Sequence, residues 1–221
     1  MNYAFKTTPY EHQLHALEKG WNKREYGYFM EMGTGKSKVI IDTAAMLFDS
    51  GEIDGFCVIA PKGVYRNWTT KEIPTHMPDH IPLRVATWRS NLNSAVKASI
   101  NRLFEINADL NTFVINIDAV ITKRGSEVLS KFLEHRKVLL VVDESTIIKT
   151  PKALRTKAMV KLGPKAAYRR ILTGSPVTKS PLDLYTQCEF LNPRLLGYAS
   201  FYGFRGHFAD TVNQNFGGRT F

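Results

Sequence analysis

Two short groups of residues could carry out chemistry on a phosphate. Residues 33–37 read Gly-Thr-Gly-Lys-Ser, and residues 143–144, about a hundred positions later, read Asp-Glu. Two glycines let the backbone curl tightly and present successive N–H donors at the start of a helix, whose dipole also favours anions. Lys36 adds a full positive charge, and the hydroxyl of Ser37 is a suitable Mg²⁺ ligand. This order of residues predicts a site for the phosphates of a nucleotide.

The residues on either side predict the elements that hold this loop. Residues 26–30 form an aromatic, strand-like run, and residues 36–49 have the composition of a helix. The loop departs from the usual pattern at one position, because Met30 replaces its first glycine. A glycine turn that only caps an ordinary helix, with Lys36 in solvent, is the alternative. The strand–loop–helix context favours the phosphate site.

The acidic pair follows an apolar strand, residues 138–142. A strand that is apolar on both faces belongs in the middle of a covered parallel sheet, where ligands bind outside the carboxyl ends of the strands. We therefore expect Asp143 and Glu144 beside the phosphate loop. Asp143 suits Mg²⁺, directly or through water, and Glu144 suits the polarisation of an attacking water. The alternative is a surface acidic pair that caps a helix at Ser145.

Composition sets limits on the class of protein. The chain has 221 residues, enough to bury a large core, and 43% of them are hydrophobic. We find no apolar run as long as a membrane span and no signal-peptide core, so we expect a cytoplasmic protein without membrane association. Two cysteines and no Cys/His cluster predict a reduced compartment, without disulfides or zinc.

The net charge of +10 is unevenly distributed, since residues 149–170 contain eight lysines and arginines and no acid. Clustered cations are typical of a surface that binds a polyanion, most commonly nucleic acid. A solvated helix face that only keeps the protein soluble would explain the same residues. Charge alone does not decide between the two.

Apolar strand-like runs alternate with helical patterns, which predicts an α/β fold with a mostly parallel central sheet covered by helices on both faces. We expect strands at residues 26–30, 55–60, 83–86, 112–117, 137–142 and 169–173. We expect helices at residues 10–23, 36–49, 64–72, 92–106, 126–134, 152–162 and 181–191. Residues 209–221 show no periodicity and read as a linker-like tail.

Three further stretches complete an ordered set. They read Phe-Cys-Val-Ile-Ala-Pro-Lys-Gly-Val-Tyr-Arg-Asn-Trp (56–68), Val-Val-Asp-Glu-Ser-Thr-Ile-Ile-Lys-Thr-Pro (141–151) and Ile-Leu-Thr-Gly-Ser-Pro-Val-Thr-Lys-Ser-Pro-Leu-Asp-Leu-Tyr (171–185). In order and spacing they resemble motifs Ia, II and III of the first motor lobe of Swi/Snf-like proteins in helicase superfamily two. Residues 9–13 resemble the upstream glutamine motif of the same family.

The resemblance covers about residues 5 to 208. It implies that residues 1–208 form a RecA-like P-loop NTPase lobe and that residues 209–221 lead toward a second lobe, of which this sequence has no strand–helix series. The compact lobe suggests a small phage or bacterial motor, acting in the cytoplasm of a bacterium or of an infected host cell.

The family also implies roles for individual residues. Gln13 would make a paired hydrogen bond to the adenine edge of ATP, because an amide offers both a donor and an acceptor. Gly33, Thr34, Gly35, Lys36 and Ser37 would hold the β- and γ-phosphates and Mg²⁺, with Asp143 as a second metal ligand and Glu144 as the catalytic base.

Other residues would face nucleic acid or link it to the nucleotide. Lys62, Arg66 and Asn67 would contact a DNA backbone, and Trp68 is either a core residue or a further contact. Thr173 and Ser175 would connect the nucleotide site to the DNA track through hydroxyl hydrogen bonds. Residues 116–119 would lie in a loop of the next motif.

One departure from the family follows the acidic pair. Many relatives have a small residue and a histidine there, whereas this chain has Ser145 and Thr146. Coupling between the nucleotide and motif III then runs through Thr146 or is weaker.

The resemblance implies a Mg²⁺-dependent ATPase that hydrolyses ATP to move on DNA, duplex rather than single-stranded, with a second lobe that supplies catalytic arginines. A stand-alone module that binds nucleotide and nucleic acid without efficient turnover is an alternative, although it would not need Glu144. A P-loop phosphotransferase is a third possibility, but motifs Ia and III argue against it.

Overall fold

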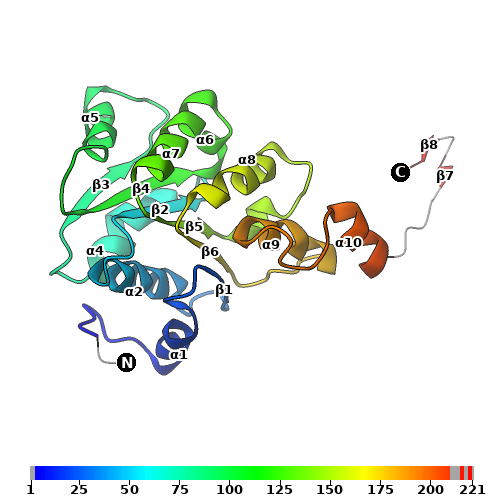
Figure 1. Ribbon diagram of the computed structural model, residues 1–221, viewed down its shortest axis with the longest axis horizontal. Coiled ribbons are helices and arrows are strands. Elements are labelled where there is room, and N and C mark those ends of the chain that lie inside the picture. Colours follow the sequence, from blue (N-terminus) through cyan, green and yellow to red (C-terminus); the bar gives the residue numbers. More distant parts are fainter. Residues whose placement is uncertain (1–2, 210–214, 217–218, 221) are drawn as a thin grey trace.

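The computed structural model describes residues 3–209, 215–216 and 219–220. Its centre is a six-stranded sheet with the strand order β1-β6-β5-β2-β4-β3 (Figure 1). Every neighbouring pair in this sheet is parallel, so the predicted parallel α/β fold is confirmed. The strands are β1 (Glu25–Phe29), β2 (Gly55–Ala60), β3 (Leu83–Thr87), β4 (Leu110–Asn116), β5 (Val138–Asp143) and β6 (Tyr168–Thr173).

Helices connect the strands and cover both faces of the sheet, as predicted (Figure 1). The longer ones are α1 (Glu11–Gly20), α2 (Lys36–Asp49), α5 (Ser94–Arg102), α7 (Lys123–His135), α8 (Leu154–Leu162), α9 (Tyr185–Leu191) and α10 (Phe201–Phe208). Short turns are α3 (Tyr65–Asn67), α4 (Ile73–His76), α6 (Ile117–Val120), η2 (Ser145–Ile148), η3 (Gly163–Lys165) and η4 (Pro181–Leu184).

The core consists of two layers, one on each face of the sheet. Alternate residues of β2 show this division, because Phe56 and Val58 pack in the layer with α2, whereas Cys57 and Ile59 pack in the layer with α5, α7 and α8. All six residues of β2 are buried. This is the environment that the apolar runs predict for central strands of a covered parallel sheet.

The strand order brings the two chemical groups of residues together. β6 lies between β1, which leads into the phosphate loop, and β5, which ends in the acidic pair. Phe29 is in register with Thr173, and Leu172 with Asp143. The last residues of all three strands therefore meet at one edge of the sheet.

The helix expected at 64–72 is divided into α3, a π-helical turn η1 (Trp68–Glu72) and α4. The hydroxyls of Thr69 and Thr70 both donate to the carbonyl oxygen of Arg66 at 3.1 Å. Side chains that bond to the preceding turn compete with the regular backbone ladder, which accounts for the wider turn. Pro74 then occupies the first turn of α4, where a missing N–H is tolerated.

Helix α10 is absent from the sequence-based prediction. Its glycines, Gly203 and Gly206, weaken the helical signal. Packing replaces propensity here, since the ring of Phe204 lies 5.4 Å from that of Tyr185 on α9. Ser200 caps the helix by accepting a hydrogen bond from the N–H of Gly203.

Part of the predicted tail, residues 209–221, lies outside the described residues, namely 210–214, 217–218 and 221. Within it, β7 (Asn215–Phe216) and β8 (Arg219–Thr220) pair antiparallel. The linker role of the tail stays a prediction. In the described part of the chain, no helix is long and apolar enough to cross a membrane.

Candidate nucleotide site

The phosphate loop depends on its two glycines. Gly33 and Gly35 both have a φ of +80°, a left-handed conformation that other residues adopt only with strain. A Cβ on Gly35 would also lie 2.3 Å from Nε2 of Gln13. Lys36 begins α2, and its Nζ donates to the carbonyl oxygens of Met30 and Glu31, each at 2.9 Å. The ammonium group therefore points into the loop.

The buried side chain of Gln13 holds this loop through a hydrogen bond to its backbone. It is only 3% exposed; its Nε2 donates to the carbonyl oxygen of Thr34 at 2.9 Å, and its Oε1 accepts from the N–H of Tyr10 at 3.0 Å. The amide thus ties the start of α1 to the loop, a role that sequence reasoning did not identify. One N–H and one lone pair of the amide are not used by these two bonds.

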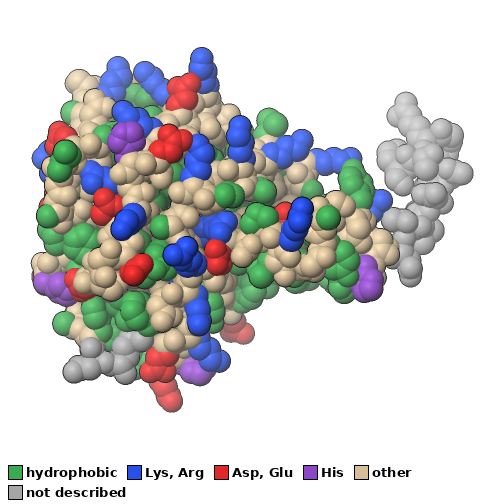
Figure 2. Space-filling model, in the orientation of Figure 1, with side chains coloured by type: hydrophobic (Ala, Val, Ile, Leu, Met, Phe, Trp, Pro, Cys, Tyr) green, Lys and Arg blue, Asp and Glu red, His purple; other side chains and the backbone are tan. Residues whose placement is uncertain are grey.

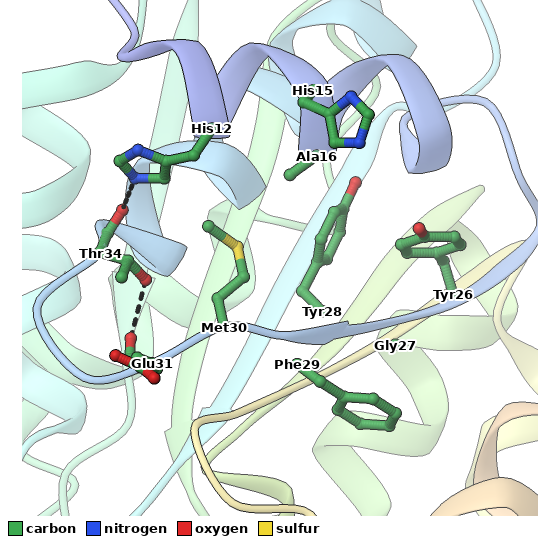
Figure 3. Close-up of a pocket in the computed structure, with 10 residues that line it drawn as sticks. All are labelled: His12, His15, Ala16, Tyr26, Gly27, Tyr28, Phe29, Met30, Glu31 and Thr34. Carbon is green, nitrogen blue, oxygen red and sulfur yellow. Dashed lines mark hydrogen bonds between the residues drawn. The ribbon is translucent and has the colours of Figure 1, made fainter.

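A cavity of about 420 Å³ opens beside the loop, between α1 and β1. Figure 3 shows His15 extending from α1 toward Tyr26 and Tyr28 of the strand, with Phe29 on the opposite side of the strand. Nε2 of His12 donates to the carbonyl oxygen of Thr34 at 3.0 Å, so the loop forms one end of this cavity (Figure 3). An aromatic, partly polar cavity next to a phosphate site is suited to a nucleotide base.

Asp143 lies at the carboxyl end of β5 and is held by Trp68. The indole Nε1 donates to Oδ2 of Asp143 at 2.9 Å. Burial raises the pKa of Asp143 above its ordinary value, and the hydrogen bond from Trp68 opposes this change. Trp68 is 2% exposed and therefore belongs to the core, not to a DNA-facing surface.

Glu144 has a left-handed backbone, with φ 51° and ψ 67°. Non-glycine residues in this region cost about 1–3 kcal/mol and gather at functional sites. Its Oε1 accepts hydrogen bonds from the hydroxyls of Thr173, at 2.7 Å, and Thr146, at 3.0 Å. The structure thus brings together the acidic pair, motif III and Thr146.

Motif III also touches the phosphate loop. The N–H of Met30 donates to the carbonyl oxygen of Thr173 at 3.2 Å, which extends the pairing of β1 with β6. A Cβ on Gly174 would lie 3.4 Å from the backbone nitrogen of Met32. Met30, in place of the pattern's first glycine, is therefore compatible with the loop, because at this point the backbone continues a strand. Ser175 follows, and its N–H donates to the Thr173 hydroxyl at 3.1 Å.

The donor set fits Mg²⁺. Ser37 at the start of α2 and Asp143 at the end of β5 both offer oxygen ligands. Among residues 3–209, no cluster of three or more His, Cys, Asp and Glu residues could hold a metal by itself. Mg²⁺ is usually bound by one or two protein oxygens together with phosphates and water, so the residues present suit this ion.

The residues predicted to face DNA lie on the same edge of the sheet, beyond β2. Lys62, Arg66 and Asn67 are all exposed, although Nε of Arg66 also donates to the hydroxyl of Tyr65 at 3.2 Å. Lys62 and Arg124, which are distant in the sequence, both line a second cavity of about 320 Å³. The predicted loop at residues 116–119 forms the end of β4 and the short helix α6.

The basic stretch has two components. Lys149, Lys165 and Arg169 pair with carboxylates, and buried Arg170 donates to backbone carbonyl oxygens that include those of Gly20 and Trp21. The other four, Lys152, Arg155, Lys157 and Lys161, are exposed on and before α8. Figure 2 shows Lys and Arg side chains on the surface over α7 and α8. Half of the basic stretch is therefore structural.

Sequence relatives are long proteins. The chain is 26% identical over 200 residues to the "Chromatin-remodeling ATPase INO80" of Arabidopsis thaliana, a match that spans 86% of this chain and 12% of the relative. It is 25% identical over 186 residues to the "Probable ATP-dependent DNA helicase CHR12" of the same plant, spanning 83% and 16%. The chain thus spans less than a fifth of the length of these relatives.

Solved structures share the fold. The "Sulfolobus solfataricus SWI2/SNF2 ATPase core in complex with dsDNA" superimposes with a TM-score of 0.72 at 22% identity, over 95% of this chain and 40% of that one. The UvsW helicase of bacteriophage T4 gives a TM-score of 0.60 at 13% identity, over 81% and 57%. These neighbours confirm the RecA-like fold.

The SNF2-related domain family matches residues 25–215, which include the phosphate loop, the acidic pair and motif III. This match confirms the resemblance to the Swi/Snf-like branch, whereas phage or bacterial origin stays a prediction. The chain belongs to the SNF2-related domain family.

Proposed function

We propose that this chain is the ATP-binding first lobe of a DNA-dependent ATPase that moves on DNA. The observation that carries the proposal is the meeting of the phosphate loop and the acidic pair at one edge of the sheet. Thr173 joins them, since its hydroxyl donates to Glu144 and its carbonyl oxygen accepts from Met30.

The loop binds the nucleotide's phosphates. Backbone N–H groups of residues 33–37 and the ammonium of Lys36 hold the β- and γ-phosphates. The present partners of Lys36 are neutral carbonyl oxygens, and an anionic phosphate oxygen forms a stronger, charge-assisted bond. Ser37 and Asp143 would hold Mg²⁺, which when bound neutralises charge on the phosphate oxygens.

Glu144 orients and deprotonates the attacking water. Thr173 and Thr146 both donate to Oε1, and we assign the water to Oε2. The reaction is an in-line attack on the γ-phosphorus, in which positioning and charge stabilisation supply most of the catalysis.

The adenine base lies at the loop end of the cavity between α1 and β1. His12 and the backbone of Thr34 form this end. The unused N–H and lone pair of Gln13 are the groups that we assign to the base, with a small shift of the amide.

DNA lies along the edge beyond β2, where Lys62, Arg66 and Asn67 contact its backbone. Duplex DNA is favoured because the Sulfolobus core of similar fold is described in complex with dsDNA. Ser175 transmits this contact to Thr173 and Glu144.

A second RecA-like lobe completes the site by supplying arginines to the γ-phosphate. Its support is the size of the Sulfolobus core, of which this chain spans 40%. An arginine supplied from outside can raise the rate about 10³- to 10⁵-fold, so this chain alone should hydrolyse ATP slowly.

Phosphate release, measured with and without duplex and single-stranded DNA, tests the proposal. Glu144→Gln should abolish release while fluorescent ATP still binds, and Lys36→Ala should weaken both. Unchanged release in either variant would refute the site assignment. Binding without release in the unmodified chain would mean that the second lobe is required for catalysis.

A further inference from the structure

We infer that Gln187, with Ser145, is a positioning residue that sets the backbone of Glu144 and joins motif II to motif III. This inference rests on the proposed function, since it concerns the residue assigned to polarise water. The sequence alone would not single out Gln187. The geometry of the Gln187 and Ser145 side chains is what carries the inference.

Gln187 lies on α9 and is fully buried. Its Oε1 accepts a hydrogen bond of 2.6 Å from the hydroxyl of Ser145, which is also fully buried. Its Nε2 donates to the carbonyl oxygens of Pro176, at 2.9 Å, and Asp183, at 2.7 Å. Both N–H groups of the amide and one oxygen lone pair are used, so the side chain is fixed in one orientation.

These bonds close a ring through the catalytic group. Glu144 accepts from Thr173, and Thr173 accepts from the N–H of Ser175. Pro176 is next along the chain and accepts from Gln187, which in turn accepts from Ser145, the residue after Glu144. The ring therefore contains the side chain of Glu144 and, on its other side, the peptide that follows it.

The backbone of Glu144 explains why such a ring is needed. A left-handed glutamate persists only where its surroundings fix it. Thr173 fixes the carboxylate, but nothing in that bond fixes the main chain. The Ser145 hydroxyl lies one residue away, and its bond to a buried amide holds η2 in place. If this bond is lost, the carboxylate of Glu144 can still accept a proton, but it is no longer held in the orientation that the attacking water requires.

The ring provides a second connection between motif II and motif III. Thr146 bonds to Glu144 itself and not to motif III. The path to motif III therefore runs through Ser145, Gln187 and Pro176, in parallel with Thr173.

Single-turnover hydrolysis, with the protein in excess over ATP and duplex DNA present, tests this inference. Gln187→Leu and Ser145→Ala should each lower the rate about 10- to 100-fold, the size of effect expected when a catalytic group is misplaced. ATP affinity should change by less than about 3-fold, because the phosphate loop is not part of the ring. The double variant should be no slower than Gln187→Leu alone, since that variant has already removed the bond to Ser145.

Thr186→Val is the matched control. The Thr186 hydroxyl donates to the carbonyl oxygen of Ile148 at 2.6 Å, from the same helix to the same turn but outside the ring. It should lower the melting temperature comparably and leave the rate within about 3-fold of the unmodified chain. The double variant also guards against misfolding, since it leaves neither the Ser145 hydroxyl nor the Gln187 amide oxygen buried without a partner.

Three outcomes would overturn the inference. One is a normal rate in Gln187→Leu while Glu144→Gln is inactive, which would leave the proposed function intact. Another is an equal loss of rate in Thr186→Val, which would reduce the pair to a general structural role. The third is hydrolysis by the unmodified chain no faster than by Glu144→Gln, which would refute the role assigned to Glu144 and, with it, this inference.

Discussion

The indole of Trp68 and the carboxylate of Asp143 are joined by a 2.9 Å hydrogen bond between residues 75 positions apart. The bond links the segment after β2 directly to the end of β5. It is partly buried, and its acceptor is the proposed metal ligand. Its loss should therefore affect both stability and the nucleotide site.

Trp68→Phe keeps most of the packing and removes the donor. We expect unfolding to require about 1.5–3 kcal/mol less free energy, the contribution of a hydrogen bond to a charged group. Urea denaturation of Trp68→Phe, Asp143→Ala and the double variant measures the coupling. In the Asp143→Ala background, Trp68→Phe should cost much less; equal costs in both backgrounds would contradict an energetic role for the bond.

The two glycines of the phosphate loop should respond differently to alanine. The Cβ of Gly33→Ala meets nothing within 4 Å, so this variant should be destabilised only by its left-handed backbone, by about 1–2 kcal/mol. Gly35→Ala has the same backbone strain and also displaces the side chain of Gln13, so it should lower the melting temperature further. The combination of Gln13→Ala with Gly35→Ala should recover part of the difference. If the two alanine variants melt alike, the contact between Gln13 and the loop is unimportant.

A buried ion pair on α2 should make stability depend on pH. Nζ of Lys38 lies 2.6 Å from Oδ2 of Asp42, and both side chains are almost fully buried. Burial raises the pKa of Asp42 to about 6, and the bond to Lys38 opposes this change. The folded state then binds a proton that the unfolded state releases near pH 4. Asp42 therefore contributes stability below pH 4, and this contribution is lost as the pH rises through 6.

The variant with Lys38→Met and Asp42→Leu removes both charges. Relative to the unmodified chain, it should gain stability as the pH rises from 4 to 6, by an amount on the order of 2–3 kcal/mol. Asp42→Leu alone should lose about 3–5 kcal/mol, because it leaves Lys38 buried and unpaired. Urea denaturation across this pH range measures both, and a difference that does not vary with pH would show that Asp42 stays ionised.

Lys62 should contribute to DNA binding in a salt-dependent way. Lys62→Ala removes one phosphate contact, so the slope of log affinity against log salt should fall by about 0.9. Fluorescence anisotropy with a duplex at several salt concentrations measures the slope. Lys157→Ala on α8 is the control, since this exposed lysine lies outside the proposed track. A larger effect of Lys157→Ala would place DNA on α8 instead.

Apolar runs and local residue chemistry predicted much of the fold. Strands such as Gly55–Ala60 are buried on both faces and were recognisable without their partners. The helix at 64–72 was wrong as a single unit because Thr69 and Thr70 bond to the preceding turn. Helix α10 was missed because aromatic packing on α9 outweighs its two glycines.

The candidate site was likewise predictable only in part. The phosphate loop and acidic pair are local patterns, and their meeting follows from parallel strand topology. The bonds of Asp143 to Trp68 and of Ser145 to Gln187 join residues 75 and 42 positions apart. Such partners are chosen by packing in three dimensions, and a single sequence carries no local signal for them.

The position of β6 has a mechanical consequence. Because β6 is bonded on both sides, to β1 and to β5, the phosphate loop and the acidic pair share one stiff frame. Neither can move against the other without shearing a strand ladder. The segment from Gly174 to Ser180 lies outside this frame, and side chains of η4 and α9, such as those of Asp183 and Gln187, hold it. In a working motor the sheet would then serve as the fixed reference, and this segment as the part that shifts when the nucleotide changes.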